Sequence, residues 1–551
     1  MRSCQLSRRT MPRSSRVLRL VVTALLAGLM SSHIAMAADE VATESGELLG
    51  TTNRDHTVRM FKGVPFAAPP RGDLRWKAPQ PTPKWTGVRR ANKYGPACLQ
   101  TDVFGDIYFR DNQPSEDCLN LVIWAPAKGA TEKLPVFVWF YGGGFVAGAN
   151  SEPRYDGEKL AAKGIIVVEP NYRLGVFGFF SHPELTKESV HNSSGNYGLL
   201  DQVAALQWVV KNIAAFGGDP NNITIGGESA GSLSVSALMA SPLSRNLFQK
   251  ALGESGAFFP SGSESGMQLN PLSRSEQVGL EFARSVGATS LAEMRAKPAN
   301  DLLQAAAKGN GASRFGPNLD GFFLPSSVRA IYEQGRQSHA PLLVGWNADE
   351  GTTLVLLNPK KPTAKSFSER AQARFGEDAP QFLKVYPAAT NREALASAEA
   401  LAGDDFIAFS TWKWIDTHRK TSGSPVYHYR FEQVPASKPG ATIDSLPARE
   451  TGARHAAEIE YVFETLKSQQ GVPWTDDDFK VSETMASYWV NFIKTGDPNG
   501  MGLPEWPKSD SANGYQVMHL SGKTSHAAPD SLRPRYEFLD AHTAKSRSST
   551  P

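Results

Sequence analysis

The chain has 551 residues, of which 40% are hydrophobic and 21% are charged, and its formal net charge is +3. This composition is typical of a globular protein with a large core, and it excludes a low-complexity or disordered chain. The first 37 residues carry six arginines and no acidic residue, so the remainder has 52 basic against 55 acidic residues, a net charge of −3. A chain with this balance gives no indication of a basic surface for nucleic acid or anionic lipid.

The N-terminus has the pattern of an export signal. Its arginines precede an apolar run at 20–30, "LVVTALLAGLM", and the small-residue pattern "AMA" follows at 35–37. This order predicts a secretory signal peptide over 1–37, and therefore a periplasmic or extracellular protein. The apolar run is too short to span a bilayer comfortably, so we expect no integral membrane segment after cleavage, with an uncut anchor as the alternative. "SRRTM" at 7–11 leaves the choice between general and twin-arginine export open.

Cysteine usage agrees with export. Cys4 leaves with the signal peptide, and Cys98 and Cys118 remain. In an oxidising compartment, two remaining cysteines predict a disulfide, and the alternative is two free buried thiols. A closed loop of about 20 residues contributes roughly 3 kcal/mol of stability in the chain-entropy description.

Apolar strands and amphipathic helices alternate along the chain. Strand patterns occupy 135–145, 164–174, 223–229 and 340–351, and helical patterns occupy 200–216 and 230–240. This alternation predicts an α/β fold with a mostly parallel central sheet and helices on both faces. Polar, alanine-rich stretches at 263–310 and 363–420 predict helical insertions. No linker divides the chain, so we expect one domain over 38–541 and a disordered tail at 542–551.

A short stretch around Ser229 carries the first sign of chemistry. Residues 227–231 read "GESAG" and fit G-x-S-x-G, with a strand before and a helix after. In a nucleophile elbow the serine occupies a sharp strand-to-helix turn, whose neighbours must be small because other backbone passes close by. The alternative is an ordinary serine in a tight turn.

A serine nucleophile also needs stabilisation of the oxyanion that it forms. "YGGGF" at 141–145 follows an apolar strand, and its glycines can point bare backbone amides into a site. The expected donors are the amides of Gly143, Gly144 and Ala230. The alternative for a glycine run is a flexible turn.

The general base must be a histidine downstream of an acid if the order Ser…acid…His holds. His455, in "GARHAAEIEYVF", follows a loop and opens a helical pattern. His428 is in a strand-like run and is expected in the core, while His339 and His418 have polar neighbours and are expected to be solvated. The late strand ends in "NADEG" at 347–351, and these residues alone leave Asp349 and Glu350 as equal candidates for the acid.

Taken together, these motifs resemble the type-B carboxylesterases, a family that includes carboxylesterases, cholinesterases and some lipases. The resemblance covers about 45 to 540 and is carried by "FGGDPNNITIGGESAGS" (216–232), "EDCLNL" (116–121), "YGGGF", "NYRLG" (171–175), "NADEG" and "HAAEIEYVF" (455–463). It implies the α/β-hydrolase fold. It also implies that Ser229 is the nucleophile, Glu350 the acid and His455 the base, with Gly143, Gly144 and Ala230 as the oxyanion hole.

The resemblance extends to residues outside the triad. It supports the Cys98–Cys118 bridge and places Glu228 beside the triad. It also implies two buried ion pairs, Arg75 with Glu116 and Arg173 with Asp201. The chain departs from the family's pattern at Asn120 and Val122, where the family usually has an aromatic residue or Thr and a small polar residue, respectively.

The resemblance implies hydrolysis of small-molecule carboxylic esters, without a metal or organic cofactor. Cholinesterases carry a tryptophan in the first disulfide loop, and residues 99–117 contain none, so choline esters are disfavoured. Phe104, Tyr108 and Phe109 could line an entrance. The alternatives are an interfacial lipase and a non-catalytic binding module of the same fold. The sequence leaves the acyl and alcohol specificity and the oligomeric state open.

Overall fold

The structure is a computed structural model that describes residue 1 and residues 39–105, 107–110, 113–127, 132–260, 268–308 and 315–548. Apart from Met1, the predicted signal peptide lies outside the described residues. Within these ranges no helix combines the length and the apolar character needed to cross a bilayer.

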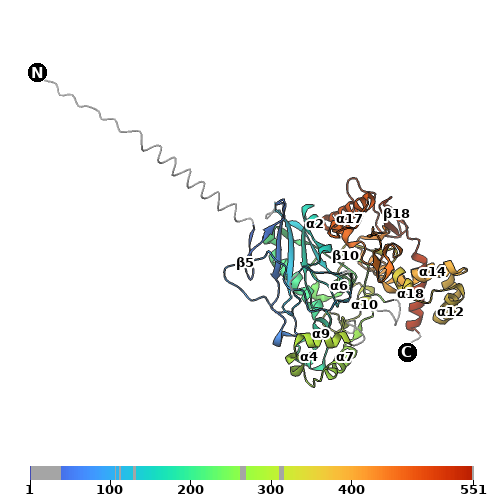
Figure 1. Cartoon of the computed structure of the whole chain (residues 1–551), viewed down its shortest axis with the longest axis horizontal. Coiled ribbons are helices and arrows are strands. Elements are labelled where there is room, and N and C mark those ends of the chain that lie inside the picture. The colour runs from blue at the N-terminus through green and yellow to red at the C-terminus, as the bar shows by residue number, and fades with distance from the viewer. Residues whose placement is uncertain are drawn as a thin grey trace.

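A mixed sheet of eleven strands forms the centre of the molecule (Figure 1). Every neighbouring pair from β8 to β17 is parallel, while the pairs at both edges are antiparallel. This arrangement confirms the predicted, mostly parallel sheet. In spatial order the strands are β18 (His526–Pro529), β17 (Gln516–Leu520), β14 (Val426–Phe431), β13 (Leu342–Asn347), β10 (Lys250–Glu254), β9 (Gly218–Glu228), β7 (Leu134–Phe140), β8 (Ile166–Pro170), β6 (Asn120–Pro126), β4 (Val58–Pro65) and β3 (Thr51–Thr52).

Helices cover both faces of this sheet, as two adjacent residues of β10 demonstrate. A Cβ on Gly253 would meet Trp414 of α15 (Phe409–Ser422) and Ser232 of α6 (Ala230–Ala240). The next side chain, Glu254, accepts a hydrogen bond from Trp489 Nε1 of α17 (Asp476–Thr495). Successive strand residues point to opposite faces, so α6 and α15 cover one face and α17 covers the other. Buried on both sides, β7, β8 and β13 are predominantly apolar runs without alternation.

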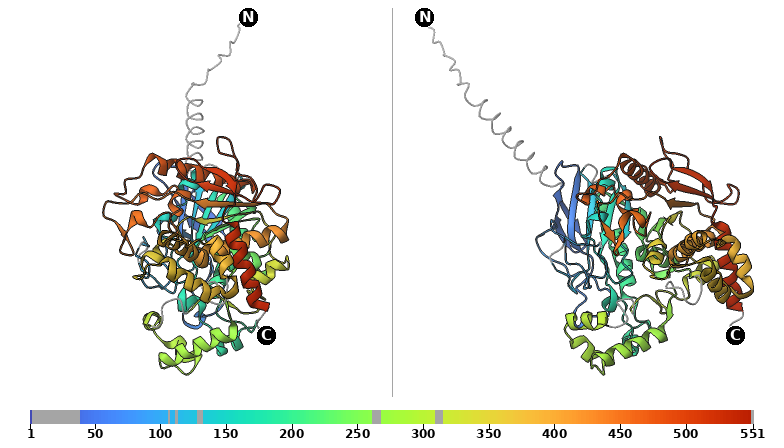
Figure 2. Two further views of the ribbon diagram at one scale, coloured as in Figure 1. Left: turned by 90° about the vertical axis from the view of Figure 1, so that its right-hand side faces the viewer. Right: turned by 45° about the vertical axis from the view of Figure 1, so that its right-hand side comes forward.

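The two predicted insertions are helical. The first contains α7 (Leu272–Ser285), α8 (Leu291–Ala296) and α9 (Ala299–Lys308), and the second contains α12 (Ala364–Phe375), α13 (Ala379–Val385) and α14 (Asn391–Gly403), which leads through a π-helical turn at Asp404–Ala408 into α15. In Figures 1 and 2, α7 and α9 lie together with α4 (Pro183–Glu188) at one end of the molecule, and α12 and α14 lie at another. Both groups lie outside the sheet, in positions from which they can contribute walls to a binding site.

The remaining elements are short, apart from two longer helices. A small sheet joins β1 (Glu40–Thr43), β2 (Gly46–Leu49) and β5 (Val88–Arg90). Two-stranded ribbons pair β11 (Asn270–Pro271) with β12 (Asn318–Leu319), and β15 (Thr442–Ile443) with β16 (Leu446–Pro447). The other helices are α2 (Glu158–Ala162), α3 (Gly175–Phe179), α5 (Tyr197–Asn212), α10 (Val328–Glu333), α11 (Thr352–Leu356), α16 (Ile459–Val462) and α18 (Arg533–Ser548).

The C-terminal helix corrects the prediction of a disordered tail. Residues 542–548 continue α18, and only 549–551 lie outside the described residues. The ring of His542 packs 5.0 Å from that of Phe375, and its Nδ1 lies 3.2 Å from Asp378 Oδ2. Because α18 packs along α13 and α15, its end is held by contacts that the polar composition of the tail did not reveal.

The three histidines that were not candidates for the general base differ in burial. His428 is buried in β14 and His339 is exposed, as predicted. The prediction that His418 is solvated is wrong: it is completely buried in α15, and its Nε2 lies 2.9 Å from the carbonyl oxygen of Ala340. Its polar neighbours on α15 misled the prediction because Asp416 and Thr417 are themselves buried.

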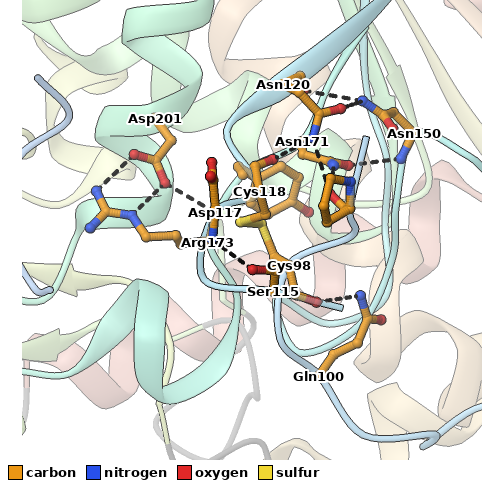
Figure 3. Close-up of a disulfide and its surroundings, with 12 residues drawn as sticks. Cys98, Gln100, Ser115, Asp117, Cys118, Asn120, Asn150, Asn171, Arg173 and Asp201 are labelled. Atoms are coloured by element: carbon orange, nitrogen blue, oxygen red, sulfur yellow. Dashed lines mark hydrogen bonds and ion pairs between the residues drawn. A yellow bond between two sulfur atoms is a disulfide. The ribbon is translucent and has the colours of Figure 1, made fainter. Parts of the chain in front are cut away.

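Cys98 and Cys118 form the predicted disulfide, with Cα atoms 4.9 Å apart (Figure 3). The two implied ion pairs are also present, Arg75 Nε lying 2.6 Å from Glu116 Oε1 and Arg173 Nη2 lying 2.8 Å from Asp201 Oδ1.

The departure at Asn120 has a structural reason. Its Nδ2 donates to the carbonyls of Pro96 and Cys118, and its own carbonyls accept from Asn150 Nδ2. Asn171 closes this network by accepting the Asn150 backbone amide and donating to Pro96, as Figure 3 shows in part. The asparagine at the start of β6 therefore ties the disulfide region to the segment after the glycine run. Val122 is buried in β6, where an apolar residue is expected.

Candidate active site

Ser229 occupies the turn between β9 and α6. Its backbone has φ 54° and ψ −119°, a conformation that a non-glycine residue adopts only where the surrounding structure imposes it. A Cβ on Gly227 would lie 2.5 Å from the carbonyl oxygen of Phe140, and one on Gly231 would lie 1.9 Å from it. The glycines of "GESAG" are therefore required by close packing against the end of β7. Ser229 itself remains partly exposed.

His455 and Glu350 meet Ser229 in a continuous chain. His455 Nε2 lies 2.9 Å from Ser229 Oγ, and His455 Nδ1 lies 2.7 Å from Glu350 Oε2. Glu350 is buried, whereas the His455 side chain is 26% exposed. The three residues come from the ends of β9 and β13 and from the loop before α16, and the structure brings them together as the resemblance implied.

Asp349 has a different position from its neighbour. Its backbone amide donates to the carbonyl of Ala453, and its Oδ2 accepts the Ala453 amide at 2.8 Å. It thus holds the loop that leads to His455, while Glu350 contacts the imidazole. Of the two residues that the sequence alone left as candidates, only Glu350 contacts His455.

Sequence reasoning missed three polar groups behind Glu350. Glu350 Oε1 accepts from Ser255 Oγ at 2.7 Å and from the Asn347 amide at 3.0 Å. Asn347 Nδ2 donates in turn to Glu458, whose other oxygen lies 3.4 Å from Ser255 Oγ. All of these side chains are buried. They hold the carboxylate of Glu350 on the side away from His455.

A repeat in the sequence could have revealed Ser255. Gly253-Glu254-Ser255 repeats the Gly227-Glu228-Ser229 triplet, and the two triplets end neighbouring parallel strands with Gly253 beside Gly227 and Glu254 beside Glu228. Ser255 even shares the φ of 54° found at Ser229. Ser255 is completely buried, so the second serine supports the site and does not face substrate. Glu458, three residues after His455, lay within a motif already quoted.

The glycine loop passes directly over the elbow. A Cβ on Gly142 would lie 3.0 Å from Ser229 Cβ, so no side chain fits between the loop and the serine. Gly143 and Gly144 have φ of 90° and 62°, and Gly144 is exposed. Within the part of the chain that the structure describes, their amides donate no hydrogen bond. The amide of Ala230, first residue of α6, has no acceptor within its helix. Of the three predicted donors, Ala230 directly follows Ser229, and Gly143 and Gly144 follow Gly142, which packs against it.

Glu228 places a second carboxyl group beside the imidazole. Its Oε1 lies 3.2 Å from His455 Nε2, and the residue is buried. Burial raises the pKa of the Glu228 carboxyl above its usual range, although His455 opposes this. Burial alone would lower the pKa of His455, but the charges of Glu350 and Glu228 outweigh it and raise that pKa. The site therefore favours the protonated imidazole, the form that a general base reaches during reaction.

Aromatic side chains flank the site and the disulfide loop. The ring of Phe406, in the π-helical turn, meets His455 edge-on with centroids 4.9 Å apart. Phe104 and Tyr108, which the sequence suggested for an entrance, are exposed, and Phe109 is half-buried.

The described residues contain no group of three His, Cys, Asp or Glu side chains arranged to hold a metal ion.

The arrangement can perform acyl transfer. It combines a hydroxyl, an imidazole within hydrogen-bonding distance and a buried carboxylate, and the glycine loop packs against the serine. Such a set activates a serine and stabilises the oxyanion of a tetrahedral intermediate.

Comparisons with known proteins agree with this chemistry. A sequence model described as "Carboxylesterase family" matches residues 37–539. The chain is 36% identical over 490 residues to a fumonisin B1 esterase of Sphingopyxis macrogoltabida, covering 85% of this chain and 84% of that protein. It is 35% identical over 480 residues to a para-nitrobenzyl esterase of Bacillus subtilis, covering 85% and 92%.

Solved structures show the same fold. A PNB esterase structure superposes with a TM-score of 0.77 at 33% identity, covering 91% of this chain and 99% of that one. A carboxylesterase of Geobacillus stearothermophilus superposes with a TM-score of 0.76 at 32% identity, covering 91% and 100%. The chain therefore belongs to the carboxylesterase family, has the α/β-hydrolase fold and is a carboxylic ester hydrolase.

Proposed function

We propose that the protein is an exported serine esterase that cleaves small-molecule carboxylic esters through an acyl-enzyme intermediate on Ser229. The observation that carries the proposal is the chain of contacts from Ser229 Oγ through His455 to the buried Glu350, at 2.9 and 2.7 Å. The strained strand-to-helix turn that Ser229 occupies, with the glycine loop packed against it, supports the same assignment.

The reaction has two halves. As Ser229 Oγ attacks the ester carbonyl, His455 Nε2 takes its proton, and the amides of Gly143, Gly144 and Ala230 stabilise the oxyanion. The protonated His455 then gives its proton to the departing alcohol, which leaves the acyl group on Ser229. A water molecule attacks this ester by the same steps and releases the acid. Glu350 orients the imidazole through Nδ1 and, with Glu228, stabilises its charged form.

The test is hydrolysis of p-nitrophenyl esters from acetate to palmitate by wild type and Ser229→Ala. We expect wild type to turn over part of the series and Ser229→Ala to lose activity by several orders of magnitude, as is typical when a triad member is removed. The matched control is Ser487→Ala, which should keep full activity, because the Ser487 hydroxyl donates to the backbone carbonyl of Glu483 at an exposed site on α17. A folded wild type that cleaves none of the esters would instead favour a binding module.

The same assay separates the interfacial lipase from an esterase. Rates measured across the solubility limit of a long-chain ester should follow ordinary saturation for an esterase. A jump in rate when droplets form would identify a lipase and contradict this part of the proposal.

Export is tested separately. With its own N-terminus, the protein should accumulate in the periplasm or medium, and its mature form should begin at Ala38, directly after the "AMA" pattern. A full-length N-terminus on protein retained in the cell would contradict export.

A further inference from the structure

The glycine loop folds back on itself, so the orientation of its amides depends on where its far end lies. The carbonyl of Gly143 accepts hydrogen bonds from the amides of Val146 and Ala147, both at 3.0 Å. A Cβ on Gly143 would lie 2.2 Å from the carbonyl oxygen of Ala147. Any movement of the residues at the end of the loop would therefore turn the peptide units on which the oxyanion donors lie.

Gln100 holds that far end at Gly148. Gln100 Nε2 donates to the carbonyl of Gly148 at 2.9 Å, and the amide of Gly148 donates to Gln100 Oε1 at 2.8 Å. The primary amide of Gln100 thus pairs with both backbone groups of one residue, as a neighbouring strand would. Gly148 has φ 124°, and a Cβ there would lie 2.3 Å from the ring of Tyr141, so the paired conformation requires glycine.

Gln100 is itself fastened to the disulfide loop. Its Nε2 also donates to the carbonyl of Cys98 at 3.0 Å, and the Cys98–Cys118 bridge is buried beside it (Figure 3). Further along the loop, Arg110 Nε donates to the carbonyl of Ser151 at 2.8 Å, and its Nη1 pairs with Asp156 at 2.8 Å. The disulfide loop therefore contacts the segment after the glycine run at two points, Gly148 and Ser151.

We propose that Gln100 is a positioning residue for the oxyanion hole. Gln100 donates one hydrogen bond to Gly148 and accepts another from it, which keeps residues 142–148 folded back and orients the amides of Gly143 and Gly144. The disulfide keeps Gln100 in place. This inference rests on the proposed function, in which those amides stabilise the oxyanion. The donors act on charge that develops only in the transition state, so loss of the clamp lowers kcat far more than it raises KM.

The test compares Gln100→Ala with Gln100→Glu. The alanine variant loses all three hydrogen bonds. The glutamate variant keeps the side-chain shape and one acceptor for the Gly148 amide, but its ionised carboxylate cannot donate to the carbonyls of Gly148 and Cys98. We expect kcat to fall about 10- to 100-fold in both variants, with KM nearly unchanged. The upper value is about the loss of kcat that follows removal of one oxyanion donor.

A trifluoromethyl ketone, whose adduct with serine carries the oxyanion, supplies the second measurement. Its affinity should fall by the same factor as kcat/KM in both variants. The matched control is Gln80→Ala, since Gln80 also donates to the carbonyl two residues before it, but at an exposed site. This control should keep kcat and inhibitor affinity.

Two results would overturn the inference. One is a Gln100 variant that loses thermal stability alone while kcat and inhibitor affinity stay at the wild-type level. The other is a rise in KM with kcat unchanged. If Gln100→Ala does not fold, Gln100→Glu decides the question by the same two measurements. Failure of the proposed function is distinguishable, because wild type and Ser229→Ala would then be equally inactive on every ester.

Discussion

Ser255 Oγ lies 2.7 Å from Glu350 Oε1, the carboxylate oxygen opposite the one that meets His455. The buried acid is thus held from both sides, by the imidazole in front and by a buried serine behind. Ser255 ends β10 in the same way that Ser229 ends the neighbouring β9, so two equivalent turns supply a partly exposed hydroxyl and a supporting one.

Ser255→Ala should lower kcat without changing KM. The substitution removes one of the hydrogen bonds that orient Glu350, and bonds to charged groups contribute about 1.5–3 kcal/mol. If that orientation is needed in the transition state, kcat falls about tenfold to a hundredfold. The matched control is Ser482→Ala, another buried serine, whose hydroxyl donates to the carbonyl of Tyr461. Equal kcat values for the two variants would show that Ser255 does not support the acid.

Glu228→Gln should move the pH profile to lower pH. Activity requires neutral His455, so kcat/KM rises with pH through the pKa of this group in the free enzyme. The charges of Glu350 and Glu228 raise that pKa, which places the wild-type midpoint above the reference of about 6.5. Removing one charge lowers the pKa and shifts the midpoint downwards, and kcat falls because the imidazolium loses support. Glu333→Gln, on the surface of α10, serves as the control; an unchanged midpoint in Glu228→Gln would contradict the assignment.

His418→Gln should make stability less sensitive to acid. Burial lowers the pKa of His418 to about 4, so between about pH 6.5 and 4 the unfolded chain binds a proton that the folded chain does not. The stabilisation is complete above this window and is lost as the pH falls through it. Each such histidine contributes about 1.4 kcal/mol per pH unit to the slope. Urea unfolding at several pH values measures how the free energy of unfolding depends on pH. This dependence should become weaker in His418→Gln and stay unchanged in His339→Gln, where the histidine is exposed.

Asp201→Ala should be strongly destabilising. Arg173 donates to both carboxylate oxygens of Asp201 through Nε and Nη2, and its backbone amide adds a third bond. Both residues are buried, so the substitution leaves an uncompensated charge and costs about 3–5 kcal/mol of unfolding free energy. Glu369→Ala, which breaks an exposed pair with Lys365, should cost about 0–1 kcal/mol. Similar urea midpoints for the two variants would contradict the role given to the buried pair.

The sequence predicted what depends on local pattern, and it failed where the cause is a contact between distant residues. Strand and helix periodicity and the G-x-S-x-G turn gave the parallel sheet and the elbow, because both follow from short-range sterics. The ambiguity between Asp349 and Glu350 could not be resolved from adjacent residues, since it depends on which one faces the loop of His455. His418 and α18 were misjudged for a related reason, because polar neighbours predict exposure only when nothing packs over them.

The residues that support the glycine loop and Glu350 could not be predicted from local sequence. Gln100 forms hydrogen bonds with Gly148, 48 positions away, and Ser255 with Glu350, 95 positions away. The Asn347 side chain reaches Glu458, 111 positions away. Nothing in the local sequence of these three residues identifies the partner. The repeated Gly-Glu-Ser triplet was visible, but its meaning depends on β9 and β10 being neighbours in register.

In the proposed mechanism, Ser229 carries the acyl group. Wild type mixed rapidly with p-nitrophenyl acetate should release a burst of about one p-nitrophenolate per active site where deacylation is the slower half. After acid quenching, mass spectrometry should find one added acetyl group on the peptide that contains Ser229, and Ser229→Ala should show neither burst nor adduct. An acetyl group on another residue, or turnover that persists in Ser229→Ala, would contradict the role proposed for Ser229.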